Sequence, residues 1–204
     1  MQIAVLTFDR FNEIDSFVVS NLLNRVPGWR AFITGATARI ESRNGVLVDA
    51  QKKLEFMAEA DAVVIGSGMK TDEIARDPVL LARIRLDPAR QLVAAQCSGA
   101  LVLGALGHLK GLPACTDQYT RPLVEKAGIE ALTDRAFVAH GNLATAGGCL
   151  SAPLIAAWMI ARRQGIAEAE RVLDSAAPVG DAPAYVARAV AAIRPYLAKA
   201  ADAA

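Results

Sequence analysis

The residues with the clearest chemical potential surround Cys97. The apolar run Gln91–Ala95 predicts a buried strand, and Ser98–Leu109 predicts a helix that starts directly after the cysteine. Small residues, Ala95 and Gly99, flank Cys97 at two positions on either side, which is the spacing of a nucleophile elbow with Cys in place of Ser. A helix N-terminus beside the sulfur favours the thiolate. A buried cysteine at an ordinary strand–helix junction explains the pattern equally well.

A glycine-rich loop, Gly66-Ser67-Gly68, follows the apolar strand predicted at Ala62–Ile65. In an α/β sheet this loop would lie beside the elbow, since ligands gather at the carboxyl ends of strands. The backbone N–H groups of Gly68 and Ser98 could then form an oxyanion hole. The alternative is a turn that needs glycine only for its dihedral angles. No Gly-Lys-Ser/Thr follows, so the loop is not a P-loop.

Two carboxylates, Glu13 and Asp15, come soon after the first predicted strand. Both could face the same cleft as Cys97, where a carboxyl group can act as a general acid or base. The alternative for Asp15 is capping of the following helix, for which Asp is a preferred residue type.

Neither of the two histidines is well placed to activate Cys97. His108 would lie roughly 15 Å along the predicted helix, and His140 falls in a predicted loop. A Cys–His hydrolase pair is therefore poorly supported. No His, Cys and carboxylate cluster has the spacing of metal ligands, so we expect neither a metal nor a cofactor.

The three cysteines are odd in number and widely spaced, which fits neither a disulfide framework nor a zinc site. We expect a reduced, cytoplasmic protein in which Cys97 reacts before Cys115 and Cys149. Cys115 has the carboxylate of Asp117 nearby. Cys149 competes more seriously because it could start a helix, but burial in the apolar stretch Leu150–Ala161 should oppose its ionisation.

Strands alternate with helices through the first two thirds of the chain, which predicts an α/β sandwich with a mostly parallel sheet. Asn44-Gly45 predicts a hairpin turn between two short strands, Arg39–Ser42 and Val46–Val48. The remaining expected elements are strands at Gln2–Phe8, Ala31–Gly35, Pro113–Thr116, Ala136–His140 and Asn142–Thr145, and helices at Asp15–Leu23, Thr120–Lys126, Gly148–Arg163 and Ala182–Ala200, with two short helices divided by Asp77-Pro78. We expect one domain over residues 1–197 and a frayed, Ala-rich tail at 198–204.

Composition excludes several classes of function. Hydrophobic residues make up 53% of the 204 residues and charged residues 21%, which disfavours disorder. A net charge of +1 and only 5% aromatic residues argue against nucleic acid and acidic membranes as partners. No apolar run reaches the length of a membrane span, and no export signal opens the chain. A small-molecule substrate is the partner that remains.

Four motifs together resemble the ThiJ/PfpI superfamily, whose fold is flavodoxin-like and class I glutamine amidotransferase-like. They are Glu13-Ile14-Asp15, Gly66-Ser67-Gly68, Gln96-Cys97-Ser98-Gly99-Ala100 and Ala144-Thr145-Ala146-Gly147-Gly148, and the resemblance runs from Ile3 to about Gly165. It implies a flavodoxin-like three-layer sandwich, a nucleophilic Cys97 and a contacting carboxylate, for which Asp15 matches best and Glu13 less well. Asp117 and Gly148 are further site candidates. The resemblance also implies a homodimer.

The chain departs from the family pattern in three places. Gly66-Ser67-Gly68 stands where members often have Pro-Gly-Gly, and Cys115-Thr116-Asp117-Gln118 stands where many have a histidine. The missing histidine argues against protease or glyoxalase chemistry. We also expect no appended DNA-binding domain, which sets the chain apart from the transcription-regulator branch.

Within the superfamily, the site pattern is most similar to that of isonitrile hydratases, which use a Cys and an Asp and need no His. The implied reaction is hydration of an isonitrile to an N-substituted formamide, with Cys97 as nucleophile and Asp15 as acid and base. Two alternatives stay open. One is glyoxalase or deglycase activity on reactive aldehydes. The other is a non-enzymatic sensor of oxidative stress, or a ligand-binding protein, that uses the same Cys97.

Overall fold

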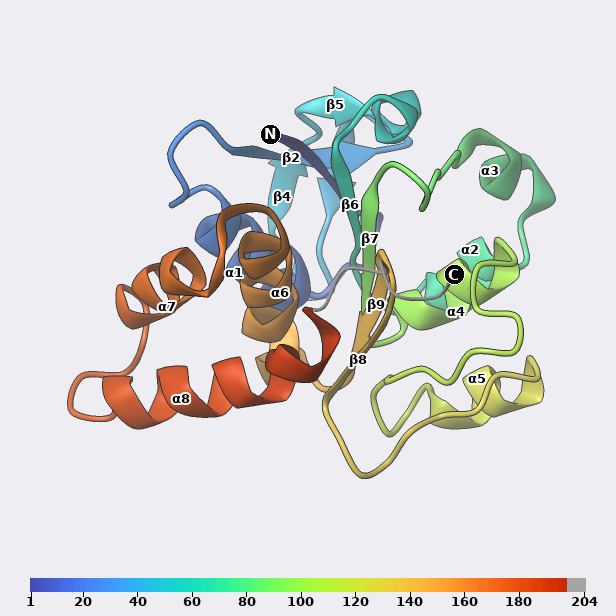
Figure 1. The fold of residues 1–204 in the computed structure, drawn as a ribbon. Coiled ribbons are helices and arrows are strands. Elements are labelled where there is room, and N and C mark those ends of the chain that lie inside the picture. The colour runs from blue at the N-terminus through green and yellow to red at the C-terminus, as the bar shows by residue number, and fades with distance from the viewer. Residues whose placement is uncertain (198–204) are drawn as a thin grey trace.

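A seven-stranded sheet forms the centre of the molecule (Figure 1). The structure is a computed structural model that describes residues 1–197, so the expected tail at 198–204 lies outside the described residues. The strands follow the order β5-β2-β1-β6-β7-β9-β8 and are parallel except for β8, which pairs antiparallel with β9. Their bounds are β1 (Gln2–Leu6), β2 (Arg30–Gly35), β5 (Lys52–Lys53), β6 (Ala62–Ile65), β7 (Leu92–Gln96), β8 (Phe137–His140) and β9 (Leu143–Ala146).

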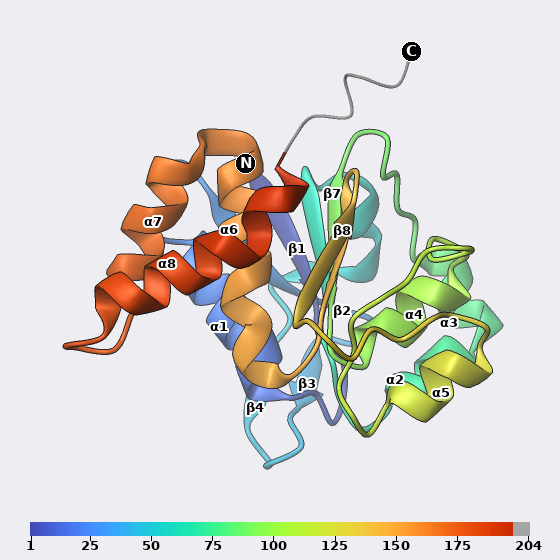
Figure 2. The same cartoon turned by 60° about the horizontal axis from the view of Figure 1, so that its bottom comes forward.

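Helices cover both faces of this sheet, which confirms the three-layer α/β sandwich (Figures 1 and 2). One face carries α1 (Glu13–Leu23), α6 (Ala152–Gln164), α7 (Ile166–Asp174) and α8 (Ala182–Ile193). The other carries the 3-10 helix η1 (Leu54–Ala58), α2 (Thr71–Ala75), α3 (Pro78–Arg83), α4 (Gly99–Ala105) and α5 (Arg121–Lys126). Two more 3-10 helices, η2 (Cys149–Ser151) and η3 (Arg194–Tyr196), flank this set.

The central strands are buried on both faces, which explains their continuous apolar sequences. All four residues of β6 and all five of β7 are buried. A strand that is covered by helices on both sides cannot alternate apolar and polar residues. The apolar runs that predicted Ala62–Ile65 and Gln91–Ala95 as strands therefore reflect their central position.

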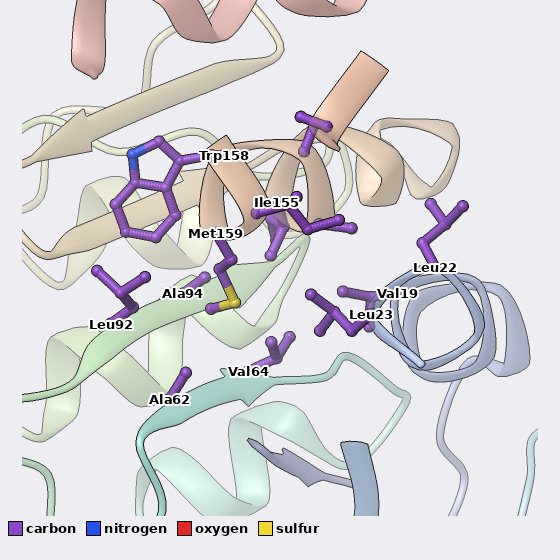
Figure 3. Close-up of a cluster of buried hydrophobic side chains, with 14 of the residues drawn as sticks. Val19, Leu22, Leu23, Ala62, Val64, Leu92, Ala94, Ile155, Trp158 and Met159 are labelled. Carbon is purple, nitrogen blue, oxygen red and sulfur yellow. The ribbon is translucent and has the colours of Figure 1, made fainter. Parts of the chain in front are cut away.

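Helix α6 supplies much of the core on its face of the sheet. Its residues Ile155, Trp158 and Met159 have the spacing of one helix face, and they point toward β6 and β7 (Figure 3). All three are fully buried. Helix α1 packs beside α6 and adds Val19, Leu22 and Leu23 to the same cluster. The two helices pack together against the sheet and fix the position of the loops that build the candidate site.

The order of the parallel strands determines where a site can form. The strands β2, β1, β6, β7 and β9 lie in the flavodoxin order, in which β2 and β6 pair with opposite edges of β1. Loops after such strands open a crevice at the carboxyl edge of the sheet. The loops after β1, β6, β7 and β9 therefore meet at one edge, although they are far apart in the sequence.

The short antiparallel pair β3 (Arg39–Glu41) and β4 (Leu47–Asp49) forms its own sheet, as the Asn44-Gly45 turn predicted. The two short helices near Asp77-Pro78 are also present, and so is the antiparallel pair before α6, whose strand ends are shifted by one residue. No helix within residues 1–197 is both long enough and apolar enough to cross a membrane.

Several predicted elements are wrong in extent or kind. The expected strand Pro113–Thr116 is reduced to an isolated bridge between Ala114 and Ala131. The helix after Cys97 ends at Ala105, not Leu109, since glycines at 104 and 107 weaken a helix there. Helix α6 begins at Ala152, not Gly148, and helix α7 was not foreseen. Helix α8 ends at Ile193, shortly before Pro195, and the last part of its expected range lies beyond residue 197.

Candidate active site

Cys97 lies between β7 and α4 in the conformation of a nucleophile elbow. Its φ of 48° is in the left-handed region, which costs a residue with a side chain roughly 1–3 kcal/mol. Two hydrogen bonds hold the turn: the Cys97 N–H donates to Ala146 O at 2.8 Å, and Thr116 Oγ1 donates to Cys97 O at 3.0 Å. A Cβ on Gly99 would stand 2.6 Å from Ile65 O, so only glycine fits there.

Asp15 lies within reach of this sulfur. Its side chain is fully buried in the first turn of α1, and a carboxylate oxygen is within 4.8 Å of Cys97 Sγ. Ser67 Oγ donates a hydrogen bond to Asp15 Oδ2, while Asp15 Oδ1 has no hydrogen-bond partner among residues 1–197. The capping alternative for Asp15 is wrong, because the side chain of Asn12 accepts the hydrogen bond from Ile14 N at the start of α1.

Glu13 has a different environment from Asp15, although both belong to the first turn of α1. Its carboxylate accepts hydrogen bonds from Ser42 Oγ and from Asn44 Nδ2, the latter at 2.9 and 3.0 Å. Burial opposes its ionisation, but these bonds outweigh that effect and lower the pKa of Glu13. Glu13 therefore anchors the β3–β4 hairpin, and Asp15 is the carboxylate that the fold places beside the thiol.

A second thiol, Cys149, joins this cluster, which the sequence did not indicate. Its Sγ lies within 4.8 Å of both Cys97 Sγ and an Asp15 oxygen, and it accepts a hydrogen bond from Asn12 Nδ2 at 3.0 Å. We expected Cys149 to be buried in an apolar helix. It lies instead in η2, ahead of α6, and it is half-buried and lines the cleft.

The loop after β9 is what brings Cys149 to the elbow. Gly148 turns the chain at a φ of 82°, a conformation that favours glycine. The side-chain amide of the fully buried Gln96 then ties this loop to the elbow: Nε2 donates to Gly148 O at 2.9 Å and to Ser151 Oγ at 3.2 Å, and it lies 3.4 Å from Cys97 Sγ. Gly148 thus contributes through its backbone, and Gln96 positions both thiols.

The two groups predicted to form an oxyanion hole do lie together, but one of them is already engaged. The Gly68 N–H donates to Thr71 Oγ1 at 3.1 Å and to Ser98 Oγ at 3.4 Å. The hydroxyl groups of Thr71 and Ser98 are themselves 2.8 Å apart. The Ser98 N–H stands at the beginning of α4, where a helix leaves its amides without acceptors.

Burial dominates the electrostatics of the cluster. It raises the pKa of Asp15, against the hydrogen bond from Ser67. It also raises the pKa of the Cys97 thiol strongly, and the negative charges of Asp15 and Cys149 add to this effect. Burial and the charge of Asp15 raise the pKa of Cys149 as well. Because each anion disfavours the other, the titrations of Asp15 and Cys97 are coupled.

A cleft of about 570 Å³ opens over the elbow. Cys97, Cys149 and Ser98 line its floor side, and Met69 and Tyr119 are strongly exposed at its wall. Asp117 also lines the cleft, where its Oδ1 accepts hydrogen bonds from Tyr119 N and Thr120 N, both at 3.0 Å. The charge of Asp117 contributes to the raised pKa values of Asp15 and Cys97.

Neither histidine lines this cleft. His140 is the last residue of β8, not part of a loop, and its Nε2 lies 2.9 Å from Pro113 O. His108 follows the end of α4, and burial lowers its pKa. The stretch Thr116-Asp117 therefore offers a hydroxyl and a carboxylate where a histidine would serve a Cys–His pair.

Asp15, Cys97 and Cys149 also form the one group within residues 1–197 whose ligand atoms are close enough together to hold a metal ion. Sequence spacing could not show this group, because the three residues follow three different strands. As an acid beside two thiols, the group can equally support nucleophilic and proton-transfer chemistry.

Comparisons with known proteins agree with this geometry. Residues 1–161 match the model of the DJ-1/PfpI family. An isonitrile hydratase of Pseudomonas putida is 27% identical over 150 residues, which cover 72% of this chain and 65% of that protein's length. The chain thus spans just under two thirds of this curated relative.

Solved structures show the same fold. A ThiJ/PfpI family protein from Pseudomonas syringae superposes with a TM-score of 0.78 at 20% identity, over 95% of this chain and 87% of that one. Oxidized DJ-1 from Toxoplasma gondii superposes with a TM-score of 0.72 at 21% identity, over 86% and 97%. With its family model spanning most of the sequence, the chain belongs to the DJ-1/PfpI family.

Proposed function

We propose that the protein hydrates an isonitrile to an N-substituted formamide, with Cys97 as the nucleophile and Asp15 as the group that moves the proton. The observation that carries this proposal is the buried Asp15 carboxyl beside Cys97 Sγ in a cleft that no histidine lines. A carboxyl group in this position can take the thiol proton and deliver it to the carbon atom under attack.

The first half of the reaction moves the proton of the Cys97 thiol to the substrate carbon. Cys97 gives its proton to Asp15, and the thiolate sulfur attacks the terminal isonitrile carbon to form a C–S bond. Asp15 then donates the proton to the same carbon, which leaves a neutral thioimidate on Cys97. Burial raises the pKa of Asp15, which makes its carboxylate a better acceptor for the thiol proton than an exposed aspartate.

The second half returns the enzyme to its resting state. Asp15, now a carboxylate, takes a proton from a water molecule that attacks the thioimidate carbon. Asp15 passes this proton to the nitrogen, the C–S bond breaks, and the hydroxyl proton of the intermediate moves through Asp15 to the leaving sulfur, which regenerates the Cys97 thiol and the Asp15 carboxylate as the formamide leaves. The net reaction adds one water to one isonitrile and consumes no other reactant.

Negative charge that develops during water attack needs a donor, and we assign this role to Ser98. Its N–H lies at the start of α4, and its hydroxyl is shared with Thr71. Gly68 takes a supporting part, because its N–H already donates to the two hydroxyl oxygens. Asp117 acts on the site through its charge, and Cys149 takes no step in this reaction.

The similarity to the isonitrile hydratase of Pseudomonas putida supports the choice of substrate class. The implied homodimer and the cytoplasmic location, which come from the family resemblance and from the reduced cysteines, remain parts of this proposal.

A comparison of substrate classes tests the proposal. The protein is incubated with cyclohexyl isocyanide or with methylglyoxal, and the products are identified by chromatography and mass spectrometry. We expect N-cyclohexylformamide from the isonitrile and no lactate from the aldehyde. Turnover of methylglyoxal with no turnover of the isonitrile would replace the proposal by the aldehyde alternative.

A further inference from the structure

The second thiol of the cluster has no part in the proposed hydration, and its surroundings suggest a separate role. Cys149 Sγ and Cys97 Sγ lie within 4.8 Å of each other, and each belongs to a loop that follows a different parallel strand. Gln96 holds the two loops together through Gly148 O and Ser151 Oγ. The contact between the thiols is thus built into the fold.

Cys149 is placed so that its sulfur can move. A disulfide requires the two sulfurs to approach to about 2.05 Å. Cys149 lies in a short 3-10 helix between Gly148 and the start of α6, not within a long helix. Cys149 is also half-buried, whereas Cys97 is 2% exposed. Both thiols line the cleft, so a small oxidant that enters the cleft can contact either of them.

Two side-chain amides face the sulfur atoms and oppose the burial that raises both thiol pKa values. Asn12 Nδ2 donates a hydrogen bond to Cys149 Sγ at 3.0 Å, and Gln96 Nε2 lies 3.4 Å from Cys97 Sγ. Asp15 Oδ1, buried and without a partner among the described residues, can accept the proton that either thiol releases. Thiolates are the forms that attack peroxides and sulfenic acids.

We propose that Cys97 and Cys149 form a reversible disulfide when a hydroperoxide oxidises the site. The Cys97 thiolate attacks the outer oxygen of the peroxide, the O–O bond breaks, and an alcohol or water leaves with the released proton. Cys97 is then a sulfenic acid. The Cys149 thiolate attacks its sulfur, the S–O bond breaks, and the oxygen leaves as water with the thiol proton. The peroxide is reduced by two electrons and the two thiols are oxidised by two.

This disulfide would protect the nucleophile from irreversible oxidation. A sulfenic acid that meets a second peroxide becomes a sulfinic acid, which ordinary thiols do not reduce. A neighbouring thiol in the same molecule reacts at a high effective concentration and therefore competes well with dilute peroxide. Oxidation would block Cys97 for catalysis, and reduction by an external dithiol would restore it.

Cys115 provides a matched control, since it belongs to the same chain but not to the cluster. It is fully buried, burial raises its pKa to about 12, and its Sγ donates to Arg135 O at 3.5 Å. A serine at this position keeps a donor for that carbonyl oxygen. Cys115→Ser should therefore leave the disulfide chemistry unchanged.

The test uses intact-mass spectrometry and peptide mapping. Reduced wild-type protein, Cys149→Ser and Cys115→Ser are treated with a small excess of hydrogen peroxide, and free thiols are blocked with N-ethylmaleimide. Wild-type and Cys115→Ser should lose two hydrogens, yield a peptide pair linked through Cys97 and Cys149, and return to the starting mass with dithiothreitol. Cys149→Ser should gain two oxygens on Cys97 and resist dithiothreitol.

Accumulation of sulfinic acid on Cys97 in the wild-type protein, with Cys149 still free to react with N-ethylmaleimide, would overturn the proposal. A disulfide that involves Cys115 would also overturn it. If Cys149→Ser does not fold, Cys149→Ala provides the same comparison. This test reads only the mass of the protein and of its peptides. Its result therefore does not depend on whether the protein hydrates isonitriles.

Discussion

Replacement of Asp15 by Asn is the perturbation that separates the proposed chemistry from the structure that supports it. Asparagine has nearly the same shape, and its carbonyl oxygen can still accept the hydrogen bond from Ser67 Oγ. Its amide cannot take a proton from Cys97 or give one to the substrate carbon. A positioned general acid or base contributes about 10²–10⁴-fold to rate, so the turnover of cyclohexyl isocyanide should fall by that factor.

The same substitution should not weaken the fold near neutral pH. Burial raises the pKa of Asp15 above the ordinary aspartate value of 3.8. The contribution of this carboxyl group to stability is therefore fully present below pH 3.8 and is lost as the pH rises through the folded-state pKa. Asparagine stays neutral throughout, so Asp15→Asn should become more stable relative to the wild type as the pH rises from acid toward neutral.

Two measurements on the same samples check this prediction. Formamide production gives kcat, and thermal unfolding followed by circular dichroism at several pH values gives the relative stability. Glu13→Gln is the control, because Glu13 contacts Ser42 and Asn44 of the hairpin and not the thiol. It should keep near wild-type activity. An Asp15→Asn variant that retains more than roughly a tenth of the wild-type kcat would refute the assigned role.

Three further predictions concern the elbow, the order of thiol labelling and the oligomeric state. Gly99→Ala should destabilise the protein by about 1–3 kcal/mol in urea unfolding, because its Cβ would stand 2.6 Å from Ile65 O; an unchanged midpoint would contradict the tight elbow. Iodoacetamide should label the half-buried Cys149 no later than the 2% exposed Cys97, which reverses the order expected from the sequence, and should label Cys115 last, as followed by peptide mapping; early labelling of Cys115 would contradict this order. Equilibrium sedimentation should show a dimer, and a single 21.5 kDa species at micromolar concentration would exclude it.

The sequence predicted the scaffold well because the central strands are buried on both faces. Continuous apolar runs such as Ala62–Ile65, which forms β6 with the predicted bounds, leave little ambiguity once helices alternate with them. The sequence left the elbow at Cys97 and an ordinary strand–helix junction equally open, and the strained turn with its close approach at Gly99 decides for the elbow. The edges of the fold were harder. Helix α7 was not predicted, because tertiary contacts decide whether it forms. The end of α4 was predicted too late, because the apolar pattern continues past the glycines that weaken the helix.

The candidate site was predictable only where a single segment carries the signal. Asp15 and Cys97 were placed by motif. Cys149 was missed because its partners Asn12 and Cys97 are distant in sequence, and because Gly148 turns the chain before α6 begins. The available signal was the position of Gly147-Gly148 directly after β9, whose carboxyl end meets the same edge of the sheet as β7.

The covalent step at Cys97 is the central claim, and intact-mass spectrometry during turnover of cyclohexyl isocyanide tests it most directly. The account predicts a transient species heavier by the mass of one isonitrile, located on the peptide that contains Cys97, and no formamide from Cys97→Ser. Undiminished formamide production by a folded Cys97→Ser variant would contradict it.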